Sequence, residues 1–215
     1  GLRRSGKSYL LNTLFVNHLL EQGVSADCIL QIDLEDAKNK PLRDPMVMLQ
    51  YIEERSNDNR QYYVILDEVQ LMSEFEEILN TLLKRRKYDV YVTGSNSRFL
   101  VTDVITEFRG RGDEIRIYPL SVAELHEAFP EKSWIDLWRE YSLYGGLPQV
   151  VLMTDEAQKT KYLKQLFRTT YLKDILDRYR IQQVEEFGQL IDFVASAIGS
   201  LTNPLKLANT FVTKG

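Results

Sequence analysis

The first eight residues contain the pattern that most restricts what this chain can fold into. They read Gly-Leu-Arg-Arg-Ser-Gly-Lys-Ser, which matches G-x-x-x-x-G-K-[ST], the phosphate-binding loop. Glycine lets the backbone turn tightly because it has no Cβ, and the N–H groups at the start of the next helix can then face phosphate oxygens. That helix is predicted over residues 8–22, where leucine and phenylalanine recur at helical spacing. The sequence therefore predicts a nucleotide-phosphate site at its N-terminal end.

Composition excludes several other kinds of site. One cysteine and two histidines among 215 residues cannot build a disulfide framework or a Cys/His zinc site. A hydrophobic content of 44% excludes a disordered chain, and a net charge of −4 excludes a uniformly basic nucleic-acid binder. Apolar runs stay well short of the roughly 18–20 residues that span a membrane. We expect a cytoplasmic protein without membrane contact.

Strands and helices alternate up to about residue 130. Strand patterns occupy 28–34, 62–66, 88–93 and 114–118, and the strand at 62–66 is apolar enough to be central in a parallel sheet. Helices are expected over 8–22 and 42–54, and after the capping-box pairs Ser73/Glu76 and Ser121/Glu124. This alternation predicts an α/β fold, a P-loop NTPase core with a parallel sheet flanked by helices. From residue 134 onward only helices are predicted, over 134–144, 155–179 and 184–199, with a last one from 204.

Two acids follow the most apolar strand. Asp67 and Glu68 come directly after Tyr62–Leu66, and an apolar strand ending in Asp-Glu is the second motif of hydrolysing P-loop proteins. We expect Asp67 and Ser8 to hold Mg²⁺, Lys7 to reach the β- and γ-phosphates, and Glu68 to act as general base toward a water molecule. A small-molecule kinase needs no such base, so Glu68 favours ATP hydrolysis over phosphate transfer to a substrate.

Two further polar positions are candidates for the same site. Asn96, preferred to Ser95, follows the strand 88–93 and would sense the γ-phosphate or orient the water; the alternative is an ordinary turn asparagine. Arg111, preferred to Arg109, lies in a glycine-rich loop and would stabilise the transition state in a neighbouring subunit, which implies a homo-oligomer. The alternative is a solvated arginine.

Taken together, these motifs resemble those of a known protein family. The chain resembles a large group of prokaryotic AAA-type P-loop ATPases with a C-terminal helical domain of unknown function. The matching stretches are 1–11, 32–36, 66–70, 93–97, 110–111, 118–121 and 144–148. The double arginine inside the loop and Tyr-Gly-Gly-Leu-Pro at 144–148 are more specific than the loop pattern alone.

The resemblance implies an additional-strand P-loop core, ATP with Mg²⁺, and a C-terminal winged helix. It implies a core over 1–130 whose first strand is missing, a helical domain over 131–197, and the start of a truncated winged helix over 198–215. The extra Gly112-Asp113 departs from the family pattern. The residues expected to bind the nucleotide are Gly1, Arg4, Ser5, Gly6, Lys7, Ser8 and Tyr9.

Three functions compete on these observations. The first is an ATP hydrolase that converts the difference between ATP and ADP into a conformational change, with a client that the sequence does not name. The second is a nucleic-acid-binding regulator switched by ATP, which binds DNA through the C-terminal region. Residues 155–180 support it with seven basic and four acidic side chains, 7 − 4 = +3, although an ordinary solvated helix face is the preferred explanation of these charges. The third, a small-molecule kinase, is disfavoured by Glu68.

Overall fold

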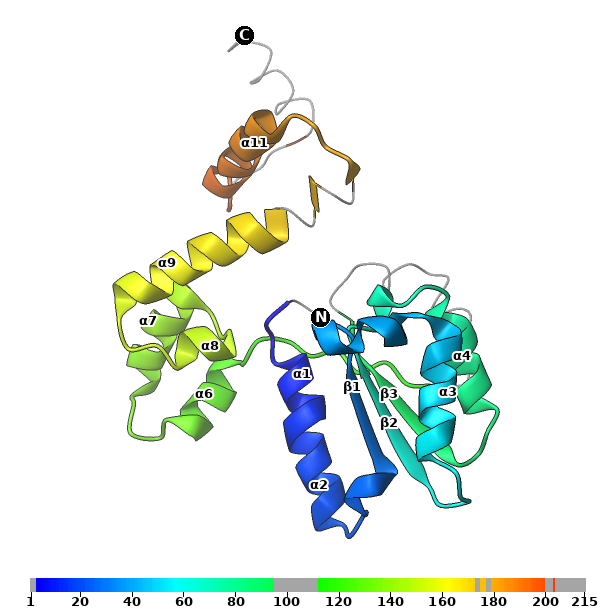
Figure 1. Cartoon of the computed structure of the whole chain (residues 1–215). Coiled ribbons are helices and arrows are strands. Elements are labelled where there is room, and N and C mark those ends of the chain that lie inside the picture. Colours follow the sequence, from blue (N-terminus) through cyan, green and yellow to red (C-terminus); the bar gives the residue numbers. More distant parts are fainter. Residues whose placement is uncertain (1–2, 95–111, 173–174, 177–178, 200–202, 204–215) are drawn as a thin grey trace. The chain divides into compact units, whose positions relative to one another are not determined.

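The computed structural model describes residues 3–94, 112–172, 175–176, 179–199 and 203 (Figure 1). Its strands are β1 (Ile29–Asp33), β2 (Tyr62–Asp67) and β3 (Tyr88–Val92). Its α-helices are α1 (Lys7–Tyr9), α2 (Val16–Glu21), α3 (Pro45–Arg55), α4 (Phe75–Leu83), α6 (Val122–Ala128), α7 (Trp134–Tyr144), α8 (Pro148–Val151), α9 (Glu156–Leu166) and α11 (Val184–Ser196). The π-helices are η1 (Leu10–Phe15) and η6 (Phe167–Leu172), and the 3₁₀ segments are η2 (Ala26–Cys28), η3 (Ala37–Arg43) and η4 (Val69–Leu71).

The described strands form one parallel sheet in the order β1-β2-β3. The register pairs Asp33 with Asp67 across β1 and β2, and Leu66 with Val92 across β2 and β3. The expectation that the apolar strand is central is confirmed, because β2 has a partner on each side and most of its residues are buried. The α/β class is confirmed as well.

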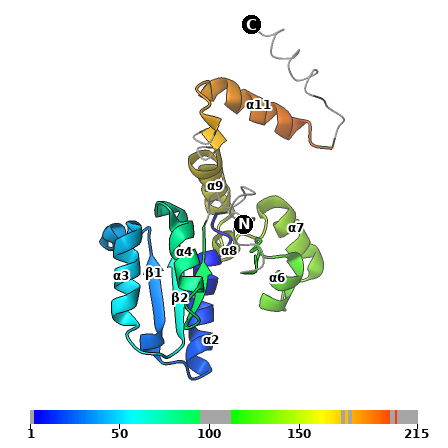
Figure 2. The same ribbon diagram turned by 90° about the vertical axis from the view of Figure 1, so that its right-hand side faces the viewer.

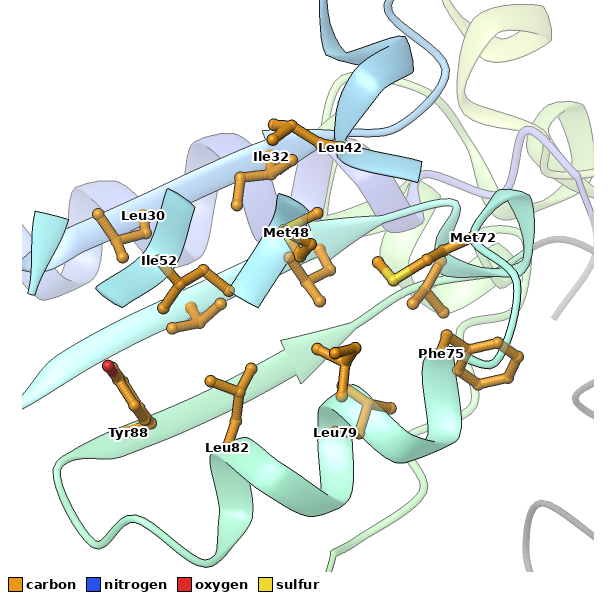
Figure 3. Packing of buried hydrophobic residues seen from close by; sticks show 14 of the residues in the cluster. Leu30, Ile32, Leu42, Met48, Ile52, Met72, Phe75, Leu79, Leu82 and Tyr88 are labelled. Carbon is orange, nitrogen blue, oxygen red and sulfur yellow. The ribbon is translucent and has the colours of Figure 1, made fainter. Parts of the chain in front are cut away.

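One face of the sheet carries the main hydrophobic core. Because side chains alternate along a strand, Leu30 and Ile32 of β1 point to the same side as Tyr62, Val64 and Leu66 of β2. Helices α3 and α4 cover this face, and Figure 3 shows their side chains meeting those of the strands. The helix residues in the core are Met48, Ile52, Phe75, Ile78, Leu79 and Leu82. This core fixes β2, whose carboxyl end carries the two acids of interest.

The opposite face of the sheet is covered by the helix that follows the phosphate loop (Figure 2). The rings of Phe15 and Tyr91 lie 4.5 Å apart, and Gln31 Nε2 donates to the backbone oxygen of Asn12 at 2.9 Å. Helices α1 and α2 are joined by the π-helical segment η1, so the predicted helix is present but its middle is wound with wider turns. Alternation therefore turns Asp67 and Thr93 toward this helix rather than toward the main core.

Two local expectations were wrong. The predicted capping box at Ser73 and Glu76 does not form, because α4 begins at Phe75 and its N-cap residue is Glu74 rather than Ser73. Glu74 has a left-handed φ of 51°, and its side chain makes no capping hydrogen bond. The predicted strand at 114–118 is not a strand in the described residues, and Ile115 and Tyr118 are exposed. An extended segment becomes a strand only when a neighbouring strand pairs with its backbone groups, and no described strand does so.

The second capping box is confirmed. Ser121 accepts a hydrogen bond from the backbone of Glu124, and the Glu124 carboxylate accepts one from the backbone of Ser121, so α6 begins at Val122. Helix α7 has the predicted bounds. It leads into the glycine turn, where Leu120 N donates to Gly146 O at 2.8 Å.

The chain divides into two compact units, Gly1–Met153 and Thr154–Gly215. The second contains α9, η6 and α11, so the predicted helix from 155 changes to a π-helix after Leu166. In the described residues no helix combines the length and the apolar content that a membrane crossing requires. The predicted winged helix over 198–215 and the helix from 204 fall almost entirely outside the described residues.

Candidate functional site

The phosphate loop enters its helix through a left-handed glycine. Gly6 has φ of 98°, a backbone conformation that residues other than glycine rarely adopt. Its carbonyl accepts the first helical hydrogen bond, from Leu10 N at 2.8 Å. Arg4 is also left-handed, with φ of 63°. Ser5, within the loop, is buried. The loop therefore has a fixed path from Arg3 to the first turn of α1.

Lys7 begins α1 and lies near both acids of the β2 strand end. Partial burial lowers the pKa of the Lys7 amine, while the negative charges of Glu68 and Asp67 act in the opposite direction. The positive charge of Arg3 adds to the lowering. A lysine at the start of the helix that follows the phosphate loop is suited to contact phosphate oxygens.

Asp67 is buried at the end of β2 and its carboxylate is held on both oxygens. Asn12 Nδ2 donates to Asp67 Oδ2 at 2.9 Å, and the Thr93 hydroxyl donates to Asp67 Oδ1. Asn12 comes from the π-helical segment and Thr93 follows β3, so two elements fix one carboxylate. An ionised carboxylate has about four acceptor positions, which leaves lone pairs for a further ligand.

Thr93 also reaches the neighbouring acid. Its Oγ1 accepts a hydrogen bond from Glu68 N at 3.2 Å, and its backbone oxygen accepts one from Val69 N at 3.0 Å. Thr93 is buried. One residue of the third strand end thus anchors the backbone and the side chain of the Asp-Glu pair.

Glu68 is held in an unusual conformation. Its φ of 55° and ψ of 45° are left-handed, a region that costs free energy for residues other than glycine and that is enriched at functional sites. Its carboxylate accepts a hydrogen bond from Gln70 Nε2, within the short 3₁₀ segment η4. The backbone bend turns Glu68 away from the path of the strand that places Asp67.

The glycine turn at 145–148 lies against the phosphate loop. A Cβ built on Gly6 would come within 3.8 Å of Pro148 Cγ, and Arg4 Nη1 lies 3.5 Å from Gln149 Oε1. Both contacts belong to the same compact unit. Segments separated by about 140 residues of sequence are therefore neighbours here.

The sequence-based site residues divide into three groups. The structure brings Lys7, Asp67 and Glu68 together, and it places Arg4, Ser5 and Gly6 in the adjoining loop. Ser8 and Tyr9 are exposed in the first turn of α1. Three predicted residues lie outside the described residues: Gly1, Asn96 and Arg111. Their roles stay predictions.

Sequence reasoning missed three residues that contact the acids: Asn12, Gln70 and Thr93. Thr93 had a usable signal, because it ends the strand beside β2 and the carboxyl ends of parallel strands meet at one edge of a sheet. Asn12 had none, because its position depends on the π-helical winding of η1. The position of the Gln70 side chain depends on the left-handed backbone at Glu68, which residue preferences do not predict.

The arrangement fits a magnesium ion bound together with phosphates. The described residues contain no cluster of three or more acidic, histidine or cysteine side chains that could bind a metal by themselves. Mg²⁺ commonly takes one or two protein oxygens and fills its other positions with water and phosphate oxygens. Asp67, whose carboxylate has lone pairs left for a metal ion, is suited to this role, and Ser8 is the hydroxyl that the loop motif assigns to the same ion.

Two family models match the chain. One, described as an AAA domain, matches residues 1–126, and the other, described as a domain of unknown function, matches residues 135–214. No solved structure matches.

Two curated proteins are similar over nearly the whole chain. An uncharacterized protein of Haemophilus influenzae is 34% identical over 219 residues, which is 100% of this chain and 54% of the relative. An uncharacterized protein of Methanocaldococcus jannaschii is 23% identical over 222 residues, which is 97% of this chain and 48% of the relative. The chain spans about half the length of these relatives.

Proposed function

Because the chain belongs to the AAA domain family, we propose that it binds ATP with Mg²⁺, hydrolyses the bond between the β- and γ-phosphates, and couples this reaction to a conformational change. The observation that carries the proposal is the link between the phosphate-loop helix and the end of β2: Asn12 donates a hydrogen bond to Asp67 at 2.9 Å, and the charges of Asp67 and Glu68 act on the Lys7 amine. A cation for the phosphates, a metal ligand and a base then lie around one strand end.

Each residue of this group has a distinct part. The backbone N–H groups from Gly6 onward and the ammonium of Lys7 bind the phosphate oxygens. Asp67 and Ser8 would hold Mg²⁺, which when bound neutralises charge on the β- and γ-oxygens. Glu68 takes a proton from the attacking water, and its position next to Asp67 keeps that base beside the metal ligand.

Two substitutions in the full-length protein test the proposal. Lys7→Ala should abolish ATP binding in a titration, because it removes the point charge on the β- and γ-phosphates. Glu68→Gln should keep ATP affinity and slow turnover roughly 10²–10⁴-fold, because the amide has nearly the same shape but cannot accept the proton. Hydrolysis at the parent rate in Glu68→Gln would remove Glu68 as the base. Unchanged ATP affinity in Lys7→Ala would refute the assignment of the loop.

The proposal includes a homo-oligomer in which Arg111 acts on the nucleotide of a neighbouring subunit. Such an arginine contributes roughly 10³–10⁵ in rate. Turnover per subunit should therefore fall when the protein is diluted, and Arg111→Ala should lower turnover without changing ATP affinity. A rate per subunit that is constant on dilution argues against action across a subunit boundary.

A second candidate function is supported by the basic helix of the C-terminal unit. Between residues 157 and 172 the chain has four basic residues and no acidic one, and Lys161, Lys164 and Arg168 are exposed. Lys161 and Lys164 are three residues apart on α9, so they lie on the same side of the helix. The second candidate is an ATP-switched regulator that binds the phosphates of DNA with this surface.

A further inference from the structure

Gln70 holds the carboxylate of Glu68 from two residues away. Its Nε2 donates a hydrogen bond to Glu68 Oε2, and its other amide atom, Oε1, is buried with no hydrogen-bond partner among the described residues. The amide nitrogen must be the atom that faces the carboxylate, because the amide oxygen there would repel an anionic acceptor. When the amide nitrogen donates to Glu68, the Oε1 atom of Gln70 is left, within the described part of the chain, as a buried acceptor without a hydrogen bond, which costs free energy.

An unsatisfied buried oxygen is uncommon in a folded protein and calls for an explanation. An amide that served stability alone would be better placed with both of its ends hydrogen-bonded or in water. The amide of Gln70 instead has one hydrogen-bonded end, on the carboxylate of Glu68. Gln70 lies in η4, which begins directly after Glu68, and the first hydrogen bond of this segment runs from Leu71 N to Glu68 O at 3.0 Å. The strained backbone of Glu68 and the unsatisfied oxygen of Gln70 thus lie two residues apart in the chain.

The backbone of Glu68 has little freedom left. Glu68 N donates to Thr93 Oγ1 at 3.2 Å, and the next residue, Val69, donates to Thr93 O at 3.0 Å. The remaining freedom is rotation of the glutamate side chain, which has three torsions between Cα and the carboxylate. The hydrogen bond from the amide of Gln70 to the carboxylate restricts that rotation.

We infer that Gln70 is a positioning residue for Glu68: its amide N–H fixes the carboxylate in the orientation from which it accepts a proton from the attacking water. This inference rests on the proposed function. Gln70 contacts neither ATP nor the water in this role, so its removal should change the rate of the chemical step and leave nucleotide affinity unchanged. Outer partners that orient metal-site ligands typically contribute about 10–100-fold to activity, and we expect an effect of the same order for a partner that orients the base.

The test is a double-mutant cycle on ATP turnover in the full-length protein. Gln70→Met keeps the length of the side chain and removes the hydrogen bond, and it should lower kcat about 10–100-fold with ATP affinity unchanged. Combined with Glu68→Gln it should change the residual kcat by less than about twofold, because Gln70 then has no base to orient. The matched control is Gln61→Met, an exposed glutamine before β2, which should leave kcat unchanged.

The outcomes separate this inference from the proposed function. Equal kcat in the parent and Gln70→Met, while Glu68→Gln is slow, overturns the role of Gln70 alone. An equal loss from Gln70→Met in both backgrounds also overturns it, because a purely structural effect does not depend on Glu68. If Gln70→Met fails to fold, Gln70→Glu keeps the shape and replaces the donor with a like charge, and it should lower kcat further. A parent protein no faster than Glu68→Gln overturns the proposed function and this inference with it.

Discussion

Thr93 connects the two acids of the site through a single hydroxyl group. It donates to Asp67 Oδ1 and accepts from Glu68 N, so the metal-ligand position and the base position share one anchor on the third strand. The hydroxyl can do both because it has one donor and two acceptor positions. The valine side chain has the same shape without these bonds, which makes the contribution of the hydroxyl measurable.

Thr93→Val should lower ATP turnover about 10–100-fold and weaken the Mg²⁺ dependence of nucleotide binding, because Asp67 loses a donor that orients it. Thr93→Ser keeps the hydroxyl and is the matched control. The measurement is kcat as a function of Mg²⁺ concentration for the two variants and the parent. Identical Mg²⁺ curves for Thr93→Val and the parent would refute the anchoring role.

The site residues that could be predicted from the sequence are those that belong to a short, continuous motif. Lys7, Asp67 and Glu68 were predicted from local patterns and the structure brings them together. Asn12 and Gln70 were not predicted, because the first depends on a π-helical turn and the second on a left-handed backbone at Glu68. Both features result from tertiary contacts that residue preferences do not encode.

At the scale of elements, the glycine turn after α7 is defined by a close approach of two backbones. A Cβ on Gly146 would lie 1.8 Å from Leu120 O and 2.9 Å from Tyr141 Cε2, far inside van der Waals contact. Leu120 N donates to Gly146 O at 2.8 Å, so the two segments are hydrogen-bonded as well as touching. This contact gives a physical reason why the segments 118–121 and 144–148, far apart in sequence, both carry the resemblance to the family.

Gly146→Ala should therefore destabilise the protein by at least about 2 kcal/mol, because the backbone of Leu120 must move to admit the methyl group. The expected fall in melting temperature is roughly 4–8 °C. Gly188→Ala is the control: a Cβ there meets nothing within 4 Å, and the residue lies inside α11. It should stabilise by about 0.5–1 kcal/mol, since alanine favours the helix over glycine. Equal melting temperatures for both variants would contradict the close approach.

Elements were predicted well where one local signal dominates. The apolar strand 62–66 became β2 and the capping box at Ser121 became the start of α6. The expectations at 114–118 and at Ser73 were wrong for a common reason. A strand needs a partner and a cap needs the helix to begin at the right residue, and both conditions are set by neighbouring elements rather than by the segment itself.

At the scale of the whole molecule, the two units differ in what they offer a partner. The N-terminal unit, Gly1–Met153, contains the sheet and the proposed ATP site, whereas the C-terminal unit contains the basic helix. The chain spans about half the length of its curated relatives, so any client that these units act on is a proposal for the whole protein. A charge-based test can be applied to the second unit without identifying that client.

The last prediction concerns DNA binding by the basic helix. If Lys161, Lys164 and Arg168 contact DNA phosphates, the logarithm of the affinity should fall linearly with the logarithm of the salt concentration. Replacing all three with Gln should make the slope less negative by roughly one for each lost contact. The control replaces three exposed cations of the N-terminal unit with Gln: Lys38, Lys40 and Arg86. It makes the same change in net charge and should leave the slope unchanged. Titrations of the full-length protein with and without ATP then show whether the nucleotide switches the affinity. Equal slopes for the two triple variants would assign α9 to an ordinary solvated face, and the ATP hydrolase would stand without a DNA-binding role.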